Sequence, residues 1–300
     1  MTAPKRARRT KAQVQQLEQQ IHDVLAADHP QSVRHVFYRM TDPRLPEPVE
    51  KSERGYQHVQ NRMVQMRRAG LLPYNWITDS TRRGYHVNTF QDAGEFVAAF
   101  AGLYRADLWE QSDHYVEVWC ESRSIAGTIE STCRDLAVSL YPAGGFASLT
   151  LAYQAAEYIK IEACGKPAEI IYIGDYDPAG VLIDKAIETE LRRHLAAGME
   201  LTFHRIAITP EQIQELNLPT KPRKEGDKRA AHIEHTVEAE AMPANLLRGL
   251  LRDAIESFLP PYALAVVKEA EQSERDGLRR LGAALQGADI HDAVEALCAD

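Results

Sequence analysis

The sequence predicts an α/β protein in which a helical N-terminal module precedes a domain built on a mostly parallel sheet. Over the first 70 residues, apolar side chains recur every three or four positions, as on amphipathic helices. From residue 115 onward, short apolar runs alternate with helical stretches, which is typical of parallel strands with helices on both faces. The chain has 300 residues, 44 % of them apolar, so it is long enough for two cores.

Three amphipathic helices are predicted in the N-terminal module, at about 12–27, 33–40 and 53–69. Ser32 is suited to cap the second helix, because its hydroxyl can accept a hydrogen bond from the first turn. The segment LLPYNWITDSTRRG then combines turn residues with short extended pieces, as in the wing that follows a helix-turn-helix. Residues 1–84 are therefore predicted to form a helical winged-helix domain.

A linker containing a helix is expected at 85–112, and a Rossmann-like parallel-sheet domain at 113–210. Residues 211–300 are expected to contain a basic loop and two C-terminal helices. The strands of the sheet domain are predicted at 115–120, 136–141, 168–174 and 201–208, its helices at 123–133, 149–163 and 180–196, and the C-terminal helices at about 244–258 and 262–285.

Charge is distributed unevenly along the chain. Residues 1–84 contain 15 Lys and Arg against 8 Asp and Glu, whereas the remainder contains 20 against 35. A basic N-terminal module in an otherwise acidic chain indicates that the module binds phosphate groups, such as those of a nucleic acid. An ordinary solvated surface is the alternative explanation.

Three carboxylates follow two of the predicted strands. Glu121 comes after VEVWC, and Asp175 and Asp177 come after AEIIYIG, in the sequence GDYDPAG. Because the carboxyl ends of parallel strands meet at the edge where α/β folds place ligands, these side chains are expected to converge on Mg²⁺ or Mn²⁺. Alternatively, these residues have purely structural roles: Asp175 caps the next helix, Asp177 favours the turn, and Glu121 is an exposed acid.

A glutamate after one apolar strand and D-x-D-P-x-G after another resemble the Toprim domain of topoisomerases, primases and related nucleases. The resemblance implies that Glu121 is an acid–base or metal-binding group, and that Asp175 and Asp177 hold Mg²⁺. With Gly145 in the loop after the second strand, the pattern is most similar to the topoisomerase VI A subunit and its meiotic double-strand-break relatives. It covers about residues 10–260, in a chain shorter than a typical A subunit.

In those relatives a winged-helix domain carries the nucleophilic tyrosine in an Arg-x-x-aromatic-Tyr motif. The sequence RHVFY at 34–38 has this form, so the resemblance implies that Tyr38 is the nucleophile and that Arg34 neutralises the scissile phosphate. Helical spacing also puts Tyr38 roughly 150° from the centre of its helix's apolar stripe, off that core face. A surface or interdomain tyrosine is the simpler alternative.

Basic residues in the third helix, the predicted wing and the segment after the sheet domain are expected to contact the phosphates of double-stranded DNA. For the last of these segments, a solvated loop is the alternative. The residues concerned are Arg54, Arg62, Arg67, Arg68, Arg82, Arg83, Lys221, Arg223 and Lys224.

The resemblance implies a type IIB topoisomerase A-like protein, which cleaves DNA by Mg²⁺-dependent transesterification through Tyr38. A homodimer is expected, because two strands must be attacked. A Toprim nuclease that hydrolyses DNA, or a DNA-binding or bridging protein that does not cut, are the alternatives. Topoisomerase VI also needs an ATPase B subunit, and this sequence has no Gly-rich phosphate loop, so a separate ATPase partner has to be considered.

A cytoplasmic, nucleoid-associated location is expected. No apolar run reaches the roughly 18 residues of a membrane span, and the first residues lack an apolar signal core. The four cysteines form no CxxC pair, so neither disulfides nor a zinc site are expected.

Overall fold

A computed structural model of the chain describes residues 9–78, 87–145, 149–223, 230 and 233–287. The chain divides into two compact units, of which the larger contains residues 1–82 and 114–256 and the smaller contains 83–113 and 257–300. The larger unit contains a parallel sheet with the strand order β2-β1-β3-β4, so the predicted α/β class is confirmed. The strands are β1 (Tyr115–Cys120), β2 (Ser139–Pro142), β3 (Ala168–Ile173) and β4 (Leu201–Ala207).

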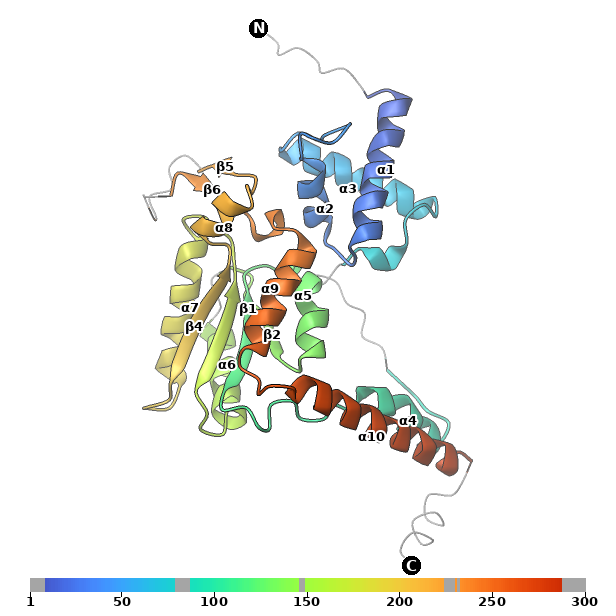
Figure 1. The fold of residues 1–300 in the computed structure, drawn as a ribbon, viewed down its shortest axis with the longest axis vertical. Helices are drawn as coiled ribbons and strands as arrows, with labels where there is room; N and C mark the ends of the chain where they lie inside the picture. Colours follow the sequence, from blue (N-terminus) through green and yellow to red (C-terminus); the bar gives the residue numbers. More distant parts are fainter. Residues whose placement is uncertain (1–8, 79–86, 146–148, 224–229, 231–232, 288–300) are drawn as a thin grey trace, which may run out of the picture. The chain divides into compact units, whose positions relative to one another are not determined.

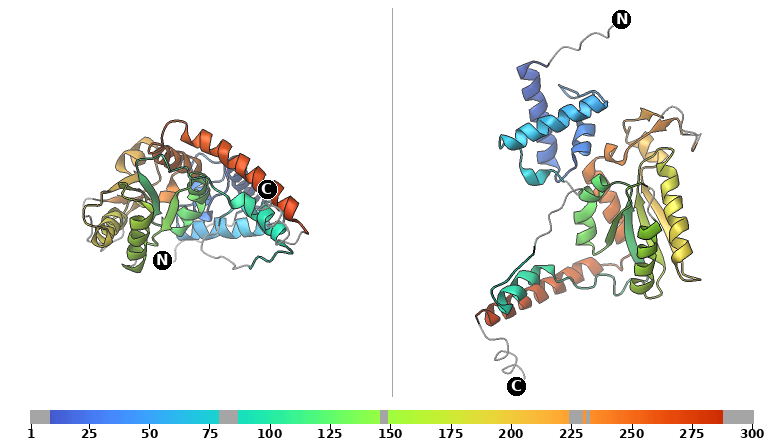
Figure 2. Two further views of the ribbon diagram at one scale, coloured as in Figure 1. Left: turned by 90° about the horizontal axis from the view of Figure 1, so that it is seen from below. Right: turned by 180° about the vertical axis from the view of Figure 1, so that it is seen from behind.

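Helices cover both faces of this sheet (Figures 1 and 2). On one face, α6 (Leu149–Glu162) and α7 (Gly180–His194) pack together over a core that includes Ile170 and Tyr172 of β3. On the other face, α5 (Arg123–Asp135) packs beside α9 (Ala244–Glu256). Every residue of β3 is buried, which explains why that strand is an uninterrupted apolar run except for one glutamate.

The N-terminal module consists of α1 (Lys11–Ala27), α2 (Val33–Met40) and α3 (Glu53–Arg68), close to the predicted helices. Each begins after a hydroxyl residue whose side chain accepts a hydrogen bond from the first turn. After α3 come the short 3-10 helix η1 (Tyr74–Trp76) and a single bridge between Gln31 and Ile77. The rest of the predicted wing, from residue 79, lies outside the described residues. The three caps are Thr10, Ser32 and Ser52.

The segment after β4 returns to the edge of the sheet where β3 ends. It contains α8 (Pro210–Glu215) and then the antiparallel pair β5 (Lys221–Pro222) and β6 (His235–Thr236). Next, Val237 and Tyr176 exchange two backbone hydrogen bonds, of 2.8 and 2.9 Å. The 3-10 helix η3 (Ala239–Ala241) follows, so this segment is fixed beside the loop that leaves β3.

The smaller unit contains α4 (Ala93–Phe100), the 3-10 helix η2 (Ala101–Leu103) and α10 (Ala263–Leu285). The two α-helices pack closely, because a Cβ on Gly282 would lie only 2.7 Å from the backbone nitrogen of Ala98. The helix that the sequence placed in a linker is therefore packed against the C-terminal helix. None of the described helices is long and apolar enough to cross a membrane.

Candidate active site

The carboxyl ends of β1 and β3 bring the three predicted acidic residues to one edge of the sheet. The strands are in parallel register, with Cys120 opposite Ile173, so Glu121 emerges beside the loop that contains Asp175 and Asp177. Oε2 of Glu121 accepts a hydrogen bond of 3.0 Å from the backbone nitrogen of Asp175. Strand register thus brings Glu121 next to Asp175, while convergence of all three carboxylates on one ion stays a prediction.

Asp177 stabilises the turn that leads from β3 into α7. Its Oδ1 accepts hydrogen bonds from the backbone nitrogens of Ala179, at 2.8 Å, and Gly180, at 2.6 Å. Gly180 is required by the tight turn, because a Cβ there would lie 2.2 Å from the carbonyl oxygen of Asp175. The alternative of purely structural roles therefore holds for Asp177, which favours this turn, but not for Asp175, because α7 begins after Ala179 without a side-chain cap.

Arg205 of β4 stabilises this turn by hydrogen bonds to its backbone. Its guanidinium donates to the carbonyl oxygens of Gly174 at 3.1 Å, Asp175 at 2.5 Å and Gly180 at 3.2 Å. It also pairs with Asp184 of α7 at 3.0 Å. Because one rigid, forked cation holds both ends of the turn, the two aspartates are positioned by β4 as well as by β3.

A fourth carboxylate, from Glu240 in η3, completes an acidic cluster with Glu121, Asp175 and Asp177. Glu240 is only 4 % exposed and accepts a hydrogen bond of 3.3 Å from the hydroxyl of Ser122. Burial raises the pKa of Asp175 well above its ordinary value, and the charges of Glu121 and Glu240 raise it further. Burial likewise raises the pKa values of Glu121 and Glu240. Holding these groups ionised is unfavourable without a compensating cation.

The donor set of this acidic cluster fits a hard divalent cation in its chemistry. In the described part of the chain, however, no three His, Cys, Asp or Glu side chains converge closely enough to hold a metal ion. One oxygen each of Glu121, Asp175 and Asp177 is engaged by a backbone N–H, which leaves the second oxygen of each carboxylate for a ligand. A bound ion would require these side chains to rotate toward one another.

A second cluster surrounds Tyr38 of α2. The tyrosine is 3 % exposed, although it lies off the apolar stripe of its own helix, because residues from distant segments cover it. The Nζ atoms of Lys51 and Lys221 lie 5.4 and 5.7 Å from its ring centre. Burial, followed by the charge of Glu238 and a hydrogen bond to that carboxylate, raises the pKa of the Tyr38 hydroxyl above its ordinary value.

Glu238 is the anion of this tyrosine cluster. Its carboxylate pairs with Arg34 Nη1 and with Lys221 Nζ, each at 2.5 Å. Burial opposes ionisation of Glu238, but the two cations outweigh it and hold the pKa at about 2. Burial and the nearby charge of Lys221 lower the pKa of Lys51 to about 8. Three basic side chains thus gather around one carboxylate, which leaves an excess of positive charge beside the tyrosine.

Residues 238–240 join the two clusters. Glu238 belongs to the tyrosine cluster, the backbone nitrogen of Ala239 donates to Asp175 Oδ1 at 2.8 Å, and Glu240 belongs to the acidic cluster. Glu238, Glu240 and Lys51 were not among the site residues predicted from the sequence. They lie in irregular segments without a motif, and the only available signal was a pair of acids two positions apart in VEAEAMP.

The four arginines predicted on α3 fall into two classes. Arg54 and Arg68 are exposed. Arg62 pairs with Glu18 of α1 at 3.2 Å, and Arg67 stacks over the ring of Tyr74 at 4.5 Å. Only the first two are therefore presented to a ligand in this conformation.

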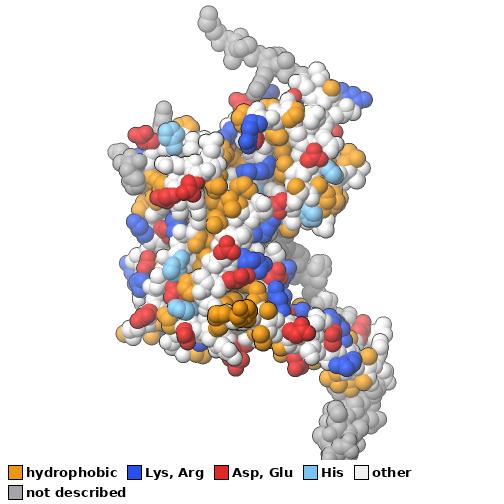
Figure 3. Space-filling model, in the orientation of Figure 1, with side chains coloured by type: hydrophobic (Ala, Val, Ile, Leu, Met, Phe, Trp, Pro, Cys, Tyr) orange, Lys and Arg blue, Asp and Glu red, His pale blue; other side chains and the backbone are white. Residues whose placement is uncertain are grey.

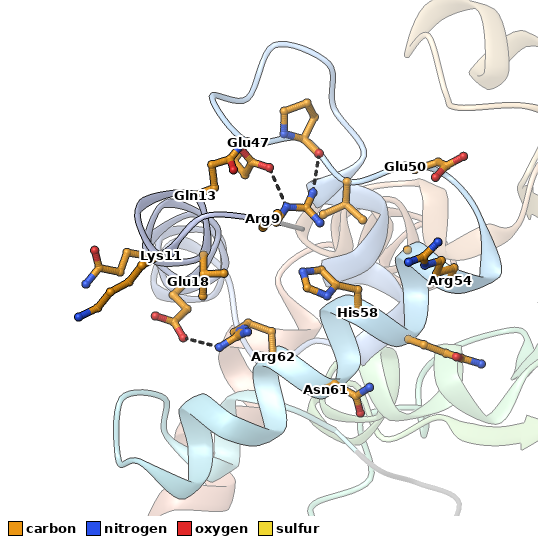
Figure 4. Close-up of a pocket in the computed structure, with 16 residues that line it drawn as sticks. Arg9, Lys11, Gln13, Glu18, Glu47, Glu50, Arg54, His58, Asn61 and Arg62 are labelled. Carbon is orange, nitrogen blue, oxygen red and sulfur yellow. Dashed lines mark hydrogen bonds and ion pairs between the residues drawn. The ribbon is translucent and has the colours of Figure 1, made fainter. Parts of the chain in front are cut away.

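A cleft of 1140 Å³ lies between α1, α3 and the loop at 47–50 (Figure 4). Figure 4 shows Arg9 turned to Glu47 and Arg62 turned to Glu18, whereas Arg54 carries no such bond. Basic and acidic side chains are also interspersed on the face shown in Figure 3. The described residues thus include no uniformly basic patch on that face.

The predicted basic residues beyond α3 are only partly described. Lys221 belongs to the tyrosine cluster, and the backbone nitrogen of Arg223 donates to the carbonyl oxygen of Glu234 at 3.0 Å. Arg82, Arg83 and Lys224 lie outside the described residues.

The chain matches no family model, no curated protein and no solved structure.

Proposed function

We propose that this chain is a DNA-cleaving protein of the type IIB topoisomerase A kind, with a winged-helix module followed by a Toprim domain. The observation that carries the proposal is the junction at residues 238–240. On one side of Ala239 lies a tyrosine among three basic side chains, and on the other lie four carboxylates at the carboxyl edge of a parallel sheet. A nucleophile, phosphate-binding groups and metal ligands are thereby close together in one unit.

In the proposed reaction, Arg34, Lys51 and Lys221 bind the phosphate and neutralise its charge. The Tyr38 oxygen attacks phosphorus and forms the Tyr–O–P bond as the bond from phosphorus to the 3′ oxygen breaks. The phenolic proton passes to solvent, and the 3′ oxygen takes a proton from solvent and leaves as a hydroxyl. The product is a 5′-phosphotyrosyl link with no net redox change.

Glu121, Asp175 and Asp177 would hold Mg²⁺ or Mn²⁺, with Glu240 beside them. When bound, the ion supplies electrostatic stabilisation of the phosphate oxygens and of the leaving oxygen. Arg205 keeps the aspartate turn in place, and Glu240 adds negative charge to the acidic cluster. The proposed partners are double-stranded DNA, a second copy of the chain for the opposite strand, and a separate ATPase subunit for strand passage.

One observation favours a second function, that of a Toprim nuclease. Because Tyr38 is 3 % exposed, its hydroxyl is not presented to DNA in this conformation. Hydrolysis by water beside the acidic cluster would need no movement of the tyrosine. The two functions differ in the fate of the cleaved DNA end.

The deciding experiment incubates the protein with supercoiled DNA and Mn²⁺, denatures it with detergent and examines the DNA ends. Transesterification leaves protein on the 5′ ends, and this product disappears in Tyr38→Phe but persists in Tyr153→Phe, a control at an exposed tyrosine of α6. A nuclease leaves free ends, and Tyr38→Phe cuts normally while Asp175→Asn does not. Intact DNA throughout, also with a candidate ATPase subunit and ATP, contradicts both.

A further inference from the structure

We infer that Glu238 occupies, in the DNA-free protein, the position that a DNA phosphate takes on binding, and that its carboxylate must be displaced before Tyr38 can act. This inference rests on the proposed function and concerns how the same site is controlled. Glu238 then acts as an internal substitute for the phosphate. The tyrosine and its basic partners are held together but inactive until DNA binds.

The contacts of Glu238 are those expected of a bound phosphate. Its two carboxylate oxygens contact Arg34 and Lys221, one each, and its charge raises the pKa of the Tyr38 hydroxyl. Arginine and lysine bind carboxylate and phosphate oxygens in the same way, so one anion can replace the other on these groups. Departure of Glu238 would free both the phosphate-binding groups and the nucleophile.

The charge of the cluster favours this exchange. Within the described part of the chain Lys51 has no carboxylate partner, and its Nζ donates instead to the carbonyl oxygen of Thr220 at 2.8 Å. Glu238 therefore neutralises only part of the charge of Arg34, Lys51 and Lys221. A backbone phosphate, with two acceptor oxygens and further phosphates on either side, is a more complete counter-ion for the three cations.

The backbone around Glu238 is fixed on both sides, so the exchange needs only a rotation of its side chain. Val237 is bound to Tyr176 by two backbone hydrogen bonds, and Ala239 is bound to Asp175. The carboxylate of Glu238 can thus swing away without moving Glu240 or the aspartate turn. The acidic cluster stays assembled while the tyrosine is released.

The test compares Glu238→Gln with Glu234→Gln in the full chain. Both variants lose one negative charge from the same segment, but Glu234 is exposed and outside the tyrosine cluster. Binding of a short duplex is followed by fluorescence anisotropy in EDTA, so that neither metal nor cleavage contributes. Glu238→Gln is expected to bind roughly tenfold more tightly than wild type, with a salt slope steeper by about 0.9 for the one additional phosphate contact.

A further variant locates the effect. Glu238→Gln combined with Lys221→Ala should lose most of the gain, because the released cation is no longer present. If Glu238→Gln does not fold, Glu238→Asp takes its place, since its shorter side chain withdraws the carboxylate from Arg34 and Lys221 and should give a smaller gain. Thermal unfolding of each variant establishes that it is folded.

The outcomes separate the inference from the proposed function. If wild type binds DNA but Glu238→Gln, or Glu238→Asp in its place, binds no more tightly, the inference is overturned and the proposed function stands. An equal gain in Glu234→Gln also overturns it, because the effect is then only one of net charge. If neither wild type nor any variant binds DNA, the proposed function fails and the inference falls with it.

Discussion

The backbone nitrogen of Ala239 donates a hydrogen bond of 2.8 Å to Oδ1 of Asp175, across 64 positions of the sequence. This bond fastens the segment that carries Glu238 and Glu240 to the turn that carries the two aspartates. It also occupies one oxygen of Asp175, which leaves the other for a ligand. The properties of the two clusters can therefore be tested separately, by substitutions on either side of this bond.

Asp175→Asn combined with Asp177→Asn should abolish binding of Mg²⁺ or Mn²⁺ without unfolding the protein. Asparagine keeps the Oδ1 acceptors for Ala239 and for the first turn of α7, while the repelling charges are removed. Titration calorimetry is expected to show weak binding in wild type and none in the variant, whose melting temperature in EDTA is unchanged or higher. Asp135→Asn, at an exposed acid of α5, is the control, and wild-type affinity in the double variant would contradict the proposed metal site.

Arg205→Lys should destabilise the protein by about 2 kcal/mol, because a lysine cannot make the several bonds that the guanidinium makes to the turn and to Asp184. Metal affinity should fall as well, since the turn loses its brace. Arg193→Lys is the matched control, because that side chain is exposed and pairs with Glu190 of the same helix, so the change should alter stability by less than about 0.5 kcal/mol. Denaturant unfolding measures both variants, and equal effects would show that Arg205 has no special role.

The buried carboxyl of Glu117 in β1 should make the free energy of unfolding depend on pH. It is fully buried between Tyr115 and Trp119, whose hydroxyl and indole nitrogen donate to it at 2.8 and 2.9 Å. Burial outweighs these hydrogen bonds and raises the pKa from 4.5 to about 7. Between these values the unfolded chain loses the proton and the folded chain keeps it, so the free energy of unfolding falls as pH rises, by about 3 kcal/mol in all.

Glu117→Gln should remove this dependence, because its amide has nearly the same shape, can still accept from Trp119 and does not titrate. The variant is expected to gain stability relative to wild type as pH rises from below 4.5 to above 7, and no further beyond that. Chemical unfolding at a series of pH values measures the difference, in which the other titrating groups cancel. Parallel curves for the two proteins would rule out a buried, neutral Glu117.

Arg54→Ala and Arg68→Ala should each reduce the salt slope of DNA binding by about 1, because both side chains are exposed on α3 and free to meet a phosphate. Arg62→Ala should instead lower stability with a smaller change in slope, because Arg62 pairs with Glu18 of α1. Anisotropy titrations at several salt concentrations, with thermal unfolding of each variant, distinguish the two classes. Equal slopes in all variants would mean that α3 does not contact DNA.

The sequence by itself determined the three N-terminal helices, the strands and helices of the sheet domain to within a few residues, and one edge of the sheet, but not α8, β5 or β6. The apolar periods at 33–40 and 168–174 identified α2 and β3, because burial on one helical stripe or on both sides of a strand leaves a period that is readable locally. The placement of Glu121 beside Asp175 and Asp177 also followed, since ends of neighbouring parallel strands meet at one edge.

Only the tertiary structure decided what surrounds Tyr38 and the aspartates. Arg34 and Glu238, which form the ion pair beside the tyrosine, are separated by 204 positions in the sequence. The helices α4 and α10, which pack together, are also far apart in the sequence. No local pattern records such pairings, because an acid that will be buried against a distant arginine has the same sequence neighbours as one in a solvated loop. The burial of Tyr38 and the membership of Glu240 in the acidic cluster are therefore consequences of chain topology, which brings together segments that are far apart in the sequence.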